Sequence, residues 1–184
     1  MADTSRIPVL EAKCDVQSAE GFREVYLNTH VALFRYLYAS SNASQPMVED
    51  WTAETYFRAW RTRHNFEGDL GAALRWLFTI GRRLMIDSYR HSNQVTPTTD
   101  LEKFDLATPQ PSPEEQTLLN EQHEHLRRVM QRLPDNQRQM LILRYILGWK
   151  VKDIAAYLDM NENTVSVNIK RALTRLRDEW STVE

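Results

Sequence analysis

Residues 151–177 read VKDIAAYLDMNENTVSVNIKRALTRLR and contain two apolar stripes with helical spacing, separated by a break. The first stripe predicts a short helix over 151–159, and the second predicts a longer basic helix that begins after Asn161. The break, Asp159–Asn161, predicts a tight turn in which Asn161 caps the second helix. A short helix, a tight turn and a longer helix have the spacing of a helix-turn-helix.

The second of these helices carries side chains that suit DNA on the side facing away from its apolar stripe. Ile154, Ala155 and Val165 are expected to hold the two helices together. Amides and hydroxyls reach base edges, Val contacts a thymine methyl, and Lys and Arg contact phosphates. The candidate DNA-contacting residues are Asn163, Thr164, Ser166, Val167, Lys170, Arg171 and Arg175. An ordinary helical hairpin with a solvated basic face is the alternative.

Upstream of this motif the sequence predicts two more helices. The sequence Ser-Pro-Glu-Glu at 112–115 fits a capping box at the start of the first helix, which runs to Leu133. Pro134 restarts the chain into NQRQMLILRYIL (136–147), which Gly148 ends.

The first half of the chain predicts another helical module. Apolar residues with helical spacing place its helices at about 19–40, 47–63 and 71–89, with a polar break at 41–46 and a loop at 64–71. The inner face of the first helix is assigned to Phe22, Val25, Tyr26, Leu33, Phe34 and Leu37. No stretch alternates well enough to predict a strand.

These patterns together predict an all-α protein with two small helical domains. Residues 92–111 contain three Pro and an excess of acid, which is typical of a flexible, poorly ordered linker. The expected organisation is a flexible N-terminus over 1–18, a helical domain over 19–91, the linker over 92–111, and a helix-turn-helix domain over 112–184.

The net charge of −2 conceals an alternation in sign along the chain. Residues 56–91 carry 7 basic and 3 acidic side chains, and residues 126–184 carry 11 and 7, so each block has a charge of +4. Residues 92–125 hold one Lys against seven acids. Two basic blocks separated by an acidic one predict two anion-facing surfaces on different domains.

Composition excludes several classes of protein. No run approaches the roughly 20 apolar residues of a membrane span, and the N-terminus lacks the pattern of a secretory signal. Cys14 is the single cysteine, and His123 and His125 point to different sides of a helix, so no metal site is predicted. No phosphate-binding glycine loop or hydrolase motif is present. We expect a soluble, cytoplasmic protein without cofactor, metal or catalytic residues.

Two longer regions resemble the extracytoplasmic-function (ECF, group IV) sigma factors of bacterial RNA polymerase. Their C-terminal, promoter-binding domain is similar to LPDNQRQMLILRYILGWKVKDIAAYLDMNENTVSVNIKRALTRLR (133–177). Their N-terminal domain is similar to FREVYLNTHVALFRYL, VEDWTAETYFRAW and NFEGDLGAALRWLFTIGRRLMIDSYR, within 22–90. The two resemblances cover most of the chain, in the order of the family.

The resemblance implies a docking site for core RNA polymerase on the second helix. In the family, an acidic pair and a following Glu-Thr dock on the clamp helices of the largest polymerase subunits. The matching residues are Glu49, Asp50, Glu54, Thr55, Arg58 and Trp60. Asp50 and Glu54 share one helical face, so they can meet basic groups of a partner. From the residues alone, a solvated acidic face is the alternative, and a catalytic carboxylate pair lacks any second set of polar groups.

The resemblance also implies that the next loop and helix open the −10 element and hold a flipped base. The matching residues are Asn65, Phe66, Arg75, Trp76, Arg82, Arg83 and Arg90. Unpaired bases need an aromatic surface for stacking and cations along the backbone, and this block supplies both. Trp76 fits the helical core equally well.

The function implied is that of a sigma factor rather than an enzyme. The partners implied are core RNA polymerase, double-stranded promoter DNA at −35, the melted −10 strand and, as a further candidate, an anti-sigma factor. Asp159 stands where the family has Gly, and Ser166 and Asn168 stand where it has basic residues, so no promoter sequence is transferable. The alternative is a conventional helix-turn-helix activator or repressor with a helical sensing domain, which does not require core polymerase.

Overall fold

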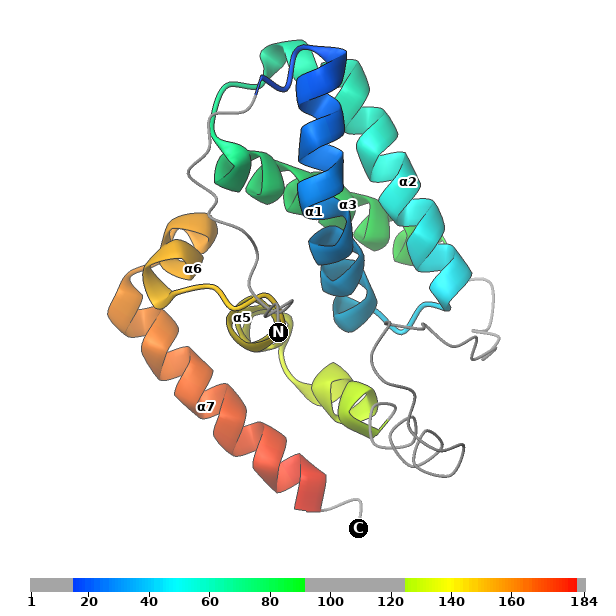
Figure 1. The fold of residues 1–184 in the computed structure, drawn as a ribbon. Helices are drawn as coiled ribbons and strands as arrows, with labels where there is room; N and C mark the ends of the chain where they lie inside the picture. Colours follow the sequence, from blue (N-terminus) through cyan, green and yellow to red (C-terminus); the bar gives the residue numbers. More distant parts are fainter. Residues whose placement is uncertain (1–14, 92–124, 182–184) are drawn as a thin grey trace, which may run out of the picture. The chain divides into compact units, whose positions relative to one another are not determined.

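The computed structural model describes residues 15–91 and 125–181, and within these ranges the chain forms helices and no β-strand (Figure 1). The chain divides into two compact units, one with the helices of the first half and one with the helices of the second half. The predicted all-α architecture with two helical domains is confirmed. The predicted linker and the capping box at 112–115 lie outside the described residues. No helix in the described ranges is long and apolar enough to cross a membrane.

The N-terminal unit is a bundle in which each of three long helices packs against the other two (Figure 1). These helices are α1 (Ala19–Ser40), α2 (Gln45–Thr62) and α3 (Leu70–His91), with a 3-10 turn, η1 (Arg63–Asn65), after α2. The side chain of Ser18 caps α1, and Pro46 occupies the first turn of α2, where its missing N–H leaves no helical bond unmade. The predicted helix over 19–40 is confirmed to the residue.

The core of this unit consists of aliphatic side chains around one stacked aromatic pair. The Tyr36 and Phe78 ring centroids lie 4.4 Å apart, and both side chains are buried. Gly81 brings α3 close to its neighbours, since a Cβ there would lie 3.1 Å from Oγ1 of Thr55 and 3.2 Å from Cδ2 of Leu37. Tyr26, predicted to face inward, keeps 44% of its surface exposed and stacks on His30 at the bundle surface.

One polar pair crosses this core between α1 and α2. The hydroxyl of Thr29 donates to the carbonyl of Val25 at 2.6 Å, so the Tyr56 hydroxyl, 2.8 Å away, donates to Thr29. Burial raises the pKa of Tyr56 well above its usual range. Tyr56 therefore stays neutral in the folded protein, and its hydroxyl ties the two helices together.

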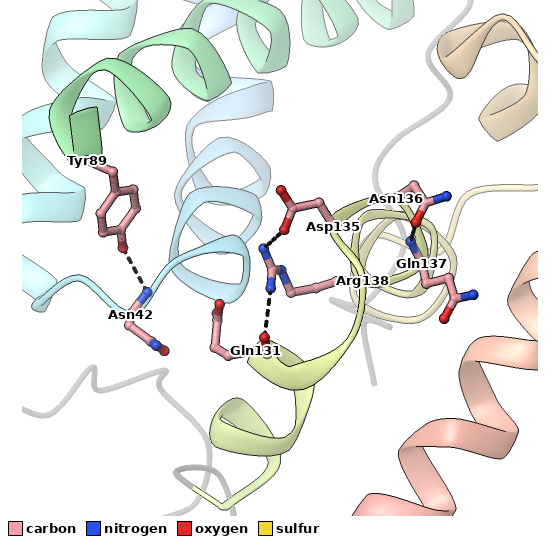
Figure 2. Close-up of polar contacts among 7 residues, drawn as sticks. All are labelled: Asn42, Tyr89, Gln131, Asp135, Asn136, Gln137 and Arg138. Atoms are coloured by element: carbon pink, nitrogen blue, oxygen red, sulfur yellow. Dashed lines mark hydrogen bonds and ion pairs between the residues drawn. The ribbon is translucent and has the colours of Figure 1, made fainter.

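A second polar contact closes the other end of the bundle. The backbone N–H of Asn42, in the loop after α1, donates to the hydroxyl of Tyr89 at 3.0 Å (Figure 2). The ring of Tyr89 also contacts Trp51 edge-on, with centroids 5.9 Å apart. The last turns of α3 are thus held against the connection between α1 and α2.

The C-terminal unit is built around one long helix. This helix, α7 (Glu162–Ser181), packs against α5 (Asp135–Leu141) and α6 (Val151–Leu158) (Figure 1). A further helix, described over 125–132, precedes Pro134. Its Arg132 forms a 3.0 Å ion pair with Glu179, and its His125 contacts Trp180 edge-on at 4.3 Å. These contacts hold it against the last turns of α7.

Arg138 holds the break at Pro134 in place. Its guanidinium donates to the carbonyl of Gln131 at 3.3 Å and to the carboxylate of Asp135, so one side chain joins the helices on either side of the break (Figure 2). Only 14% of the Arg138 side chain is exposed, whereas its partner Asp135 is 76% exposed, so Arg138 acts mainly as a packed link and the ion pair itself adds little.

The predicted continuous helix over 136–147 is wrong in one respect. After α5 the hydrogen bonds widen into a π-helical turn, η2 (Ile142–Ile146). The N–H of Trp149 donates to the carbonyl of Leu143 at 2.9 Å, and Gly148 has a φ of +70°. The predicted stop at Gly148 is confirmed, because only glycine adopts this backbone without strain.

Candidate nucleic-acid and protein interfaces

The outer side of α2 carries an acidic face, which we define as Glu49, Asp50, Glu54 and Arg58. Nε of Arg58 donates to the Glu54 carboxylate at 2.7 Å, with side chains 50% and 43% exposed. Nε2 of Gln45 donates to Glu49 at 2.9 Å. Ion pairs this exposed contribute little to stability, so Glu54 can exchange Arg58 for a basic group on a partner at small cost.

Two residues predicted for the same role lie elsewhere. Thr55 is fully buried, and its hydroxyl donates to the carbonyl of Trp51 at 2.7 Å. Trp60 is half-buried, edge-on to Phe22 at 5.1 Å, with Cζ of Arg63 3.5 Å from its ring centroid. Thr55 therefore supports α2 from the core, and Trp60 belongs to the end of α2 rather than to the acidic face.

The arginines predicted on α3 share the outer side of that helix. Arg75, Arg82, Arg83 and Arg90 are spaced so that all four project away from the buried residues Leu74, Leu77 and Phe78. Arg90 lies 4.0 Å from Asp87 in an exposed pair. Among residues 15–91, no carboxylate forms an ion pair with Arg75, Arg82 or Arg83. The phosphate backbone of a nucleic acid can therefore approach these three cations without displacing an acidic partner of this unit.

The loop before α3 places Phe66 on Trp76. The ring centroids lie 4.9 Å apart at an interplanar angle of 24°, and both side chains are half-buried. The N–H of Phe66 donates to the carbonyl of Arg63 at 3.1 Å, and the carboxylate of Asp69 caps α3 by accepting from Ala72 at 2.6 Å. Trp76 is thus part of a surface aromatic pair next to Arg75, rather than a core residue.

Two further features belong to the region around Phe66 and Trp76, here called the corner. Gly68 makes room for the loop, because a Cβ there would lie 2.7 Å from Cβ of Ala72 and 3.2 Å from the Phe66 ring. Asn65 is exposed in η1. The corner therefore offers an exposed amide, a stacked aromatic pair and a row of cations, which is the chemistry that unpaired bases and their phosphates require.

The helix-turn-helix of the C-terminal unit has the predicted geometry. Asp159 has a φ of 52°, in the left-handed region, and the N–H of Met160 donates to the carbonyl of Ala155 at 2.9 Å. The side chain of Asn161 then accepts from the N–H of Asn163 at 2.8 Å. Of the residues predicted to lock the helices, Ile154, Ala155 and Val165 are all buried.

All residues predicted for −35 DNA lie on the outer side of α7. Exposed here are Asn163, Thr164, Ser166, Val167, Lys170, Arg171 and Arg175. Val167 is 46% exposed, a large apolar side chain at the surface near the helix N-terminus. Asn168, in contrast, bonds its own helix at the carbonyl of Thr164, 2.9 Å away. The N-terminal half of α7 thus presents short polar and apolar groups, and its middle presents cations.

The remaining sequence candidates are His123, His125 and Cys14. Within the described residues, no group of His, Cys, Asp and Glu side chains is arranged to hold a metal ion. His125 packs on Trp180, whereas His123 and Cys14 lie outside the described residues.

Arg63 and the segment 15–18 were not predicted as functional. The sequence assigns residues 15–18 to a flexible N-terminus, yet Val16 is 2% exposed and the carbonyl of Gln17 accepts a 3.1 Å hydrogen bond from Nε of Arg63. A single apolar residue and a single arginine have no periodicity, so no sequence pattern indicated this contact.

Comparison with known families matches both halves of the chain. The sigma-70 region 2 family matches residues 26–94, and the sigma-70 region 4 family matches residues 123–176. The acidic face and the corner at Phe66 fall in the first match, and the helix-turn-helix falls in the second.

Two curated relatives are similar along most of this chain. The ECF RNA polymerase sigma factor SigX of Bacillus subtilis is 31% identical over 166 residues, which are 86% of this chain and 82% of SigX. The ECF RNA polymerase sigma factor BldN of Streptomyces coelicolor is 29% identical over 178 residues, which are 95% of this chain but 66% of BldN. The chain thus spans just under two thirds of the length of BldN.

A solved structure shares the fold at lower identity. The sigma factor RpoE of Bartonella quintana, solved in complex with the anti-sigma factor NepR, has a TM-score of 0.65 and 20% identity. The match covers 89% of this chain and 98% of that one.

Proposed function

Because this chain belongs to the ECF RNA polymerase sigma factors, we propose that it binds core RNA polymerase and directs promoter-specific initiation of transcription. The observation that supports this most is the presence of both a region 2 and a region 4 match, in that order, in one chain. A conventional helix-turn-helix regulator accounts for the second match and not for the first.

In this proposal, the acidic face of α2 binds core polymerase. Asp50 and Glu54 lie one turn apart on an exposed surface, and the intrahelical partner of Glu54 is exchangeable. Complementary charge gives such an interface its orientation and its fast association. The buried Thr55 contributes by keeping α2 packed rather than by contact.

The corner around Phe66 and Trp76 holds the melted −10 strand in this proposal. The aromatic pair supplies a surface for a base extruded from the duplex, and Arg75, Arg82, Arg83 and Arg90 follow the phosphates. Exposed Asn65 adds a hydrogen-bonding group at the same corner.

The helix-turn-helix reads the −35 duplex. Asn163, Ser166 and Val167 lie near the N-terminus of α7, the end that enters the major groove in this motif, whereas Lys170, Arg171 and Arg175 lie farther along and contact phosphates.

The protein has no reaction of its own in this scheme, since polymerase performs the phosphoryl transfer. It acts where polymerase and DNA meet, in the cytoplasm, and an anti-sigma factor is a further partner of the kind seen with RpoE of Bartonella quintana.

Run-off transcription with core polymerase tests the proposal. Genomic fragments are transcribed with core enzyme alone and with core enzyme plus this protein. They are also transcribed with core enzyme plus a housekeeping sigma factor, with and without this protein. We expect discrete run-off products when this protein is added to core enzyme without the housekeeping factor, and no such products with core enzyme by itself. Products that need the housekeeping factor, and are only modulated by this protein, would instead identify a conventional helix-turn-helix regulator.

A further inference from the structure

The N-terminal residues Asp15–Ser18, here called the strap, fold back over the first turn of α1. The hydroxyl of Ser18 donates to the carbonyl of Asp15 at 3.2 Å while accepting from the N–H of Gly21 at 3.1 Å. Gly21 is what permits this arrangement, because a Cβ at that position would lie 1.9 Å from the carbonyl oxygen of Asp15. Any other residue at 21 forces the strap to move.

Arg63 connects the strap to the end of α2. Its Nε donates to the carbonyl of Gln17 at 3.1 Å, and one of its terminal nitrogens donates to the carbonyl of Trp60 at 2.6 Å. The guanidinium also stacks over the Trp60 ring, with Cζ 3.5 Å from the ring centroid. Nε and one terminal nitrogen of Arg63 are thus bonded to backbone carbonyls of this unit.

The next contact in this chain reaches the aromatic pair. The carbonyl of Arg63 accepts from the N–H of Phe66 at 3.1 Å, and Phe66 stacks on Trp76. The strap, Arg63 and Phe66 therefore form a continuous series of contacts from residue 15 to the corner proposed to hold the melted strand.

We propose that the strap and Arg63 are positioning elements for capture of the −10 strand, setting the place of the Phe66–Trp76 pair without contacting DNA. This inference rests on the proposed function for its substrate, a single strand of promoter DNA. A pre-ordered Phe66–Trp76 pair binds an extruded base more tightly than a mobile pair, because ordering the loop on binding costs free energy. Direct contact between Arg63 and a phosphate is the competing account of the same residue.

Two variants separate these accounts. Gly21→Ala displaces the strap by steric overlap while keeping every charge and placing a better helix former in α1. Arg63→Ala removes the link itself. Arg61→Ala is the matched control, since Arg61 lies two positions earlier and its guanidinium lies 5.8 Å from the Phe57 ring, away from the strap.

The first measurement needs only the free, full-length protein. Hydrogen exchange over residues 63–69 is expected to accelerate about tenfold in Gly21→Ala and in Arg63→Ala, with the interiors of α1, α2 and α3 unchanged. Unchanged exchange over 63–69 in Gly21→Ala overturns the inference, whatever the protein does with polymerase.

The second measurement uses holoenzyme and a fragment that gives protein-dependent run-off product. In Gly21→Ala and Arg63→Ala, affinity for the single-stranded −10 oligonucleotide is expected to fall about tenfold, which is the order of one lost base stack. Both variants should bind core enzyme and −35 duplex as wild type does. Arg61→Ala should bind the oligonucleotide with wild-type affinity. The salt dependence of oligonucleotide binding should be unchanged in Gly21→Ala and Arg63→Ala, because no phosphate contact is lost.

Three results would contradict the inference in this second measurement. A defect confined to Arg63→Ala, with the salt slope reduced by about one, identifies a phosphate contact instead. A loss of oligonucleotide binding in proportion to a loss of core affinity or of melting temperature identifies a general structural role. Wild-type binding in both variants shows that the aromatic pair needs no positioning. If the wild-type holoenzyme itself fails to bind the oligonucleotide, the proposed function is wrong. The exchange measurement still tests whether the strap and Arg63 order residues 63–69.

Discussion

Asp159 shows at the scale of one residue how the helix-turn-helix tolerates an unfavourable backbone. It holds a φ of 52° between α6 and α7, a conformation that costs an L-residue roughly 1–2 kcal/mol but that Asp and Asn adopt more readily than others. The side chain is exposed, so its size has no effect on packing. Backbone preference alone should therefore determine which residues are tolerated at this turn.

We expect the free energy of unfolding to follow that preference. Asp159→Gly should stabilise the C-terminal unit by about 0.5 kcal/mol, because relief of the left-handed strain exceeds the added entropy of the unfolded chain. Asp159→Val should destabilise it by about 1–2 kcal/mol, because a β-branched side chain opposes this backbone. Urea unfolding of the three proteins tests the order, and a Val variant as stable as wild type would contradict it.

Tyr56 makes folding sensitive to alkaline pH. Burial raises its pKa in the folded state, whereas the unfolded chain ionises near the ordinary value of about 10. Below that value both states keep the proton, so the stabilisation is complete. Above it only the unfolded state gains by ionising, and the free energy of unfolding falls by about 1.4 kcal/mol per pH unit.

Tyr56→Phe isolates this effect from the other tyrosines. At neutral pH we expect a loss of about 0.5–1.5 kcal/mol, from the hydrogen bond to Thr29. Between pH 10 and 11 the difference between wild type and variant should shrink and then reverse, as measured by urea unfolding at each pH. A difference that is constant across this range would mean that Tyr56 ionises freely in the folded protein.

At the scale of elements, α2 combines a buried side that holds the bundle and an acidic face that remains available. The double reversal Asp50→Arg with Glu54→Arg is expected to abolish binding to core polymerase, since reversing charges at an interface costs at least the roughly 2–5 kcal/mol of removing them. Circular dichroism should show unchanged helicity, because both residues lie on the outer side.

A matched control for that reversal lies on α1. Glu20 and Glu24 are also exposed and one turn apart, so Glu20→Arg with Glu24→Arg changes the net charge equally on another helix. Co-elution with core enzyme should be lost only for the α2 variant. Equal losses from both variants would assign the effect to overall charge instead of the acidic face.

On α7, position along the helix separates base reading from phosphate binding. Ser166→Ala and Val167→Ala should change the ranking of −35 duplexes by roughly 1–3 kcal/mol per lost base contact. Arg171→Ala should weaken all duplexes alike and lower the salt slope by about one. A salt titration over a panel of −35 duplexes measures both quantities, and a reordered panel with Arg171→Ala alone would reverse our orientation of the helix.

At the scale of the whole molecule, the two basic blocks of the sequence fall on separate compact units. Arg83 on α3 and Arg171 on α7 belong to different units. Changes at independent sites add to within about 0.5 kcal/mol, whereas changes at coupled sites do not.

A double-mutant cycle on promoter binding by holoenzyme tests this independence. Arg83→Ala and Arg171→Ala should each weaken occupancy, and the double variant should show the sum of the two free-energy changes to within about 0.5 kcal/mol. A coupling energy well above that value would show that −35 binding and −10 capture act as one step.

The helices, their caps and the helix-turn-helix were predictable from sequence because they depend on neighbours a few positions apart. The bounds of α1, the tight turn at Asp159–Asn161 and the Asn161 cap of α7 follow from helical spacing and capping chemistry. The family resemblance needed no more than this local order, since the motifs that carry it are themselves helices and turns.

Only the tertiary structure decided which distant segments meet. Four contacts join residues whose spacing has no helical period. They are Tyr56 with Thr29, Trp76 with Phe66 outside the core, Thr55 with Gly81, and Arg63 with the strap. The π-helical turn after α5 was equally beyond prediction, because one added residue in a helix changes no local preference. The sequence by itself determined the helices and the faces they expose. Packing decided which of those side chains are held in place and which remain available to bind, because burial depends on neighbours that are distant in the chain.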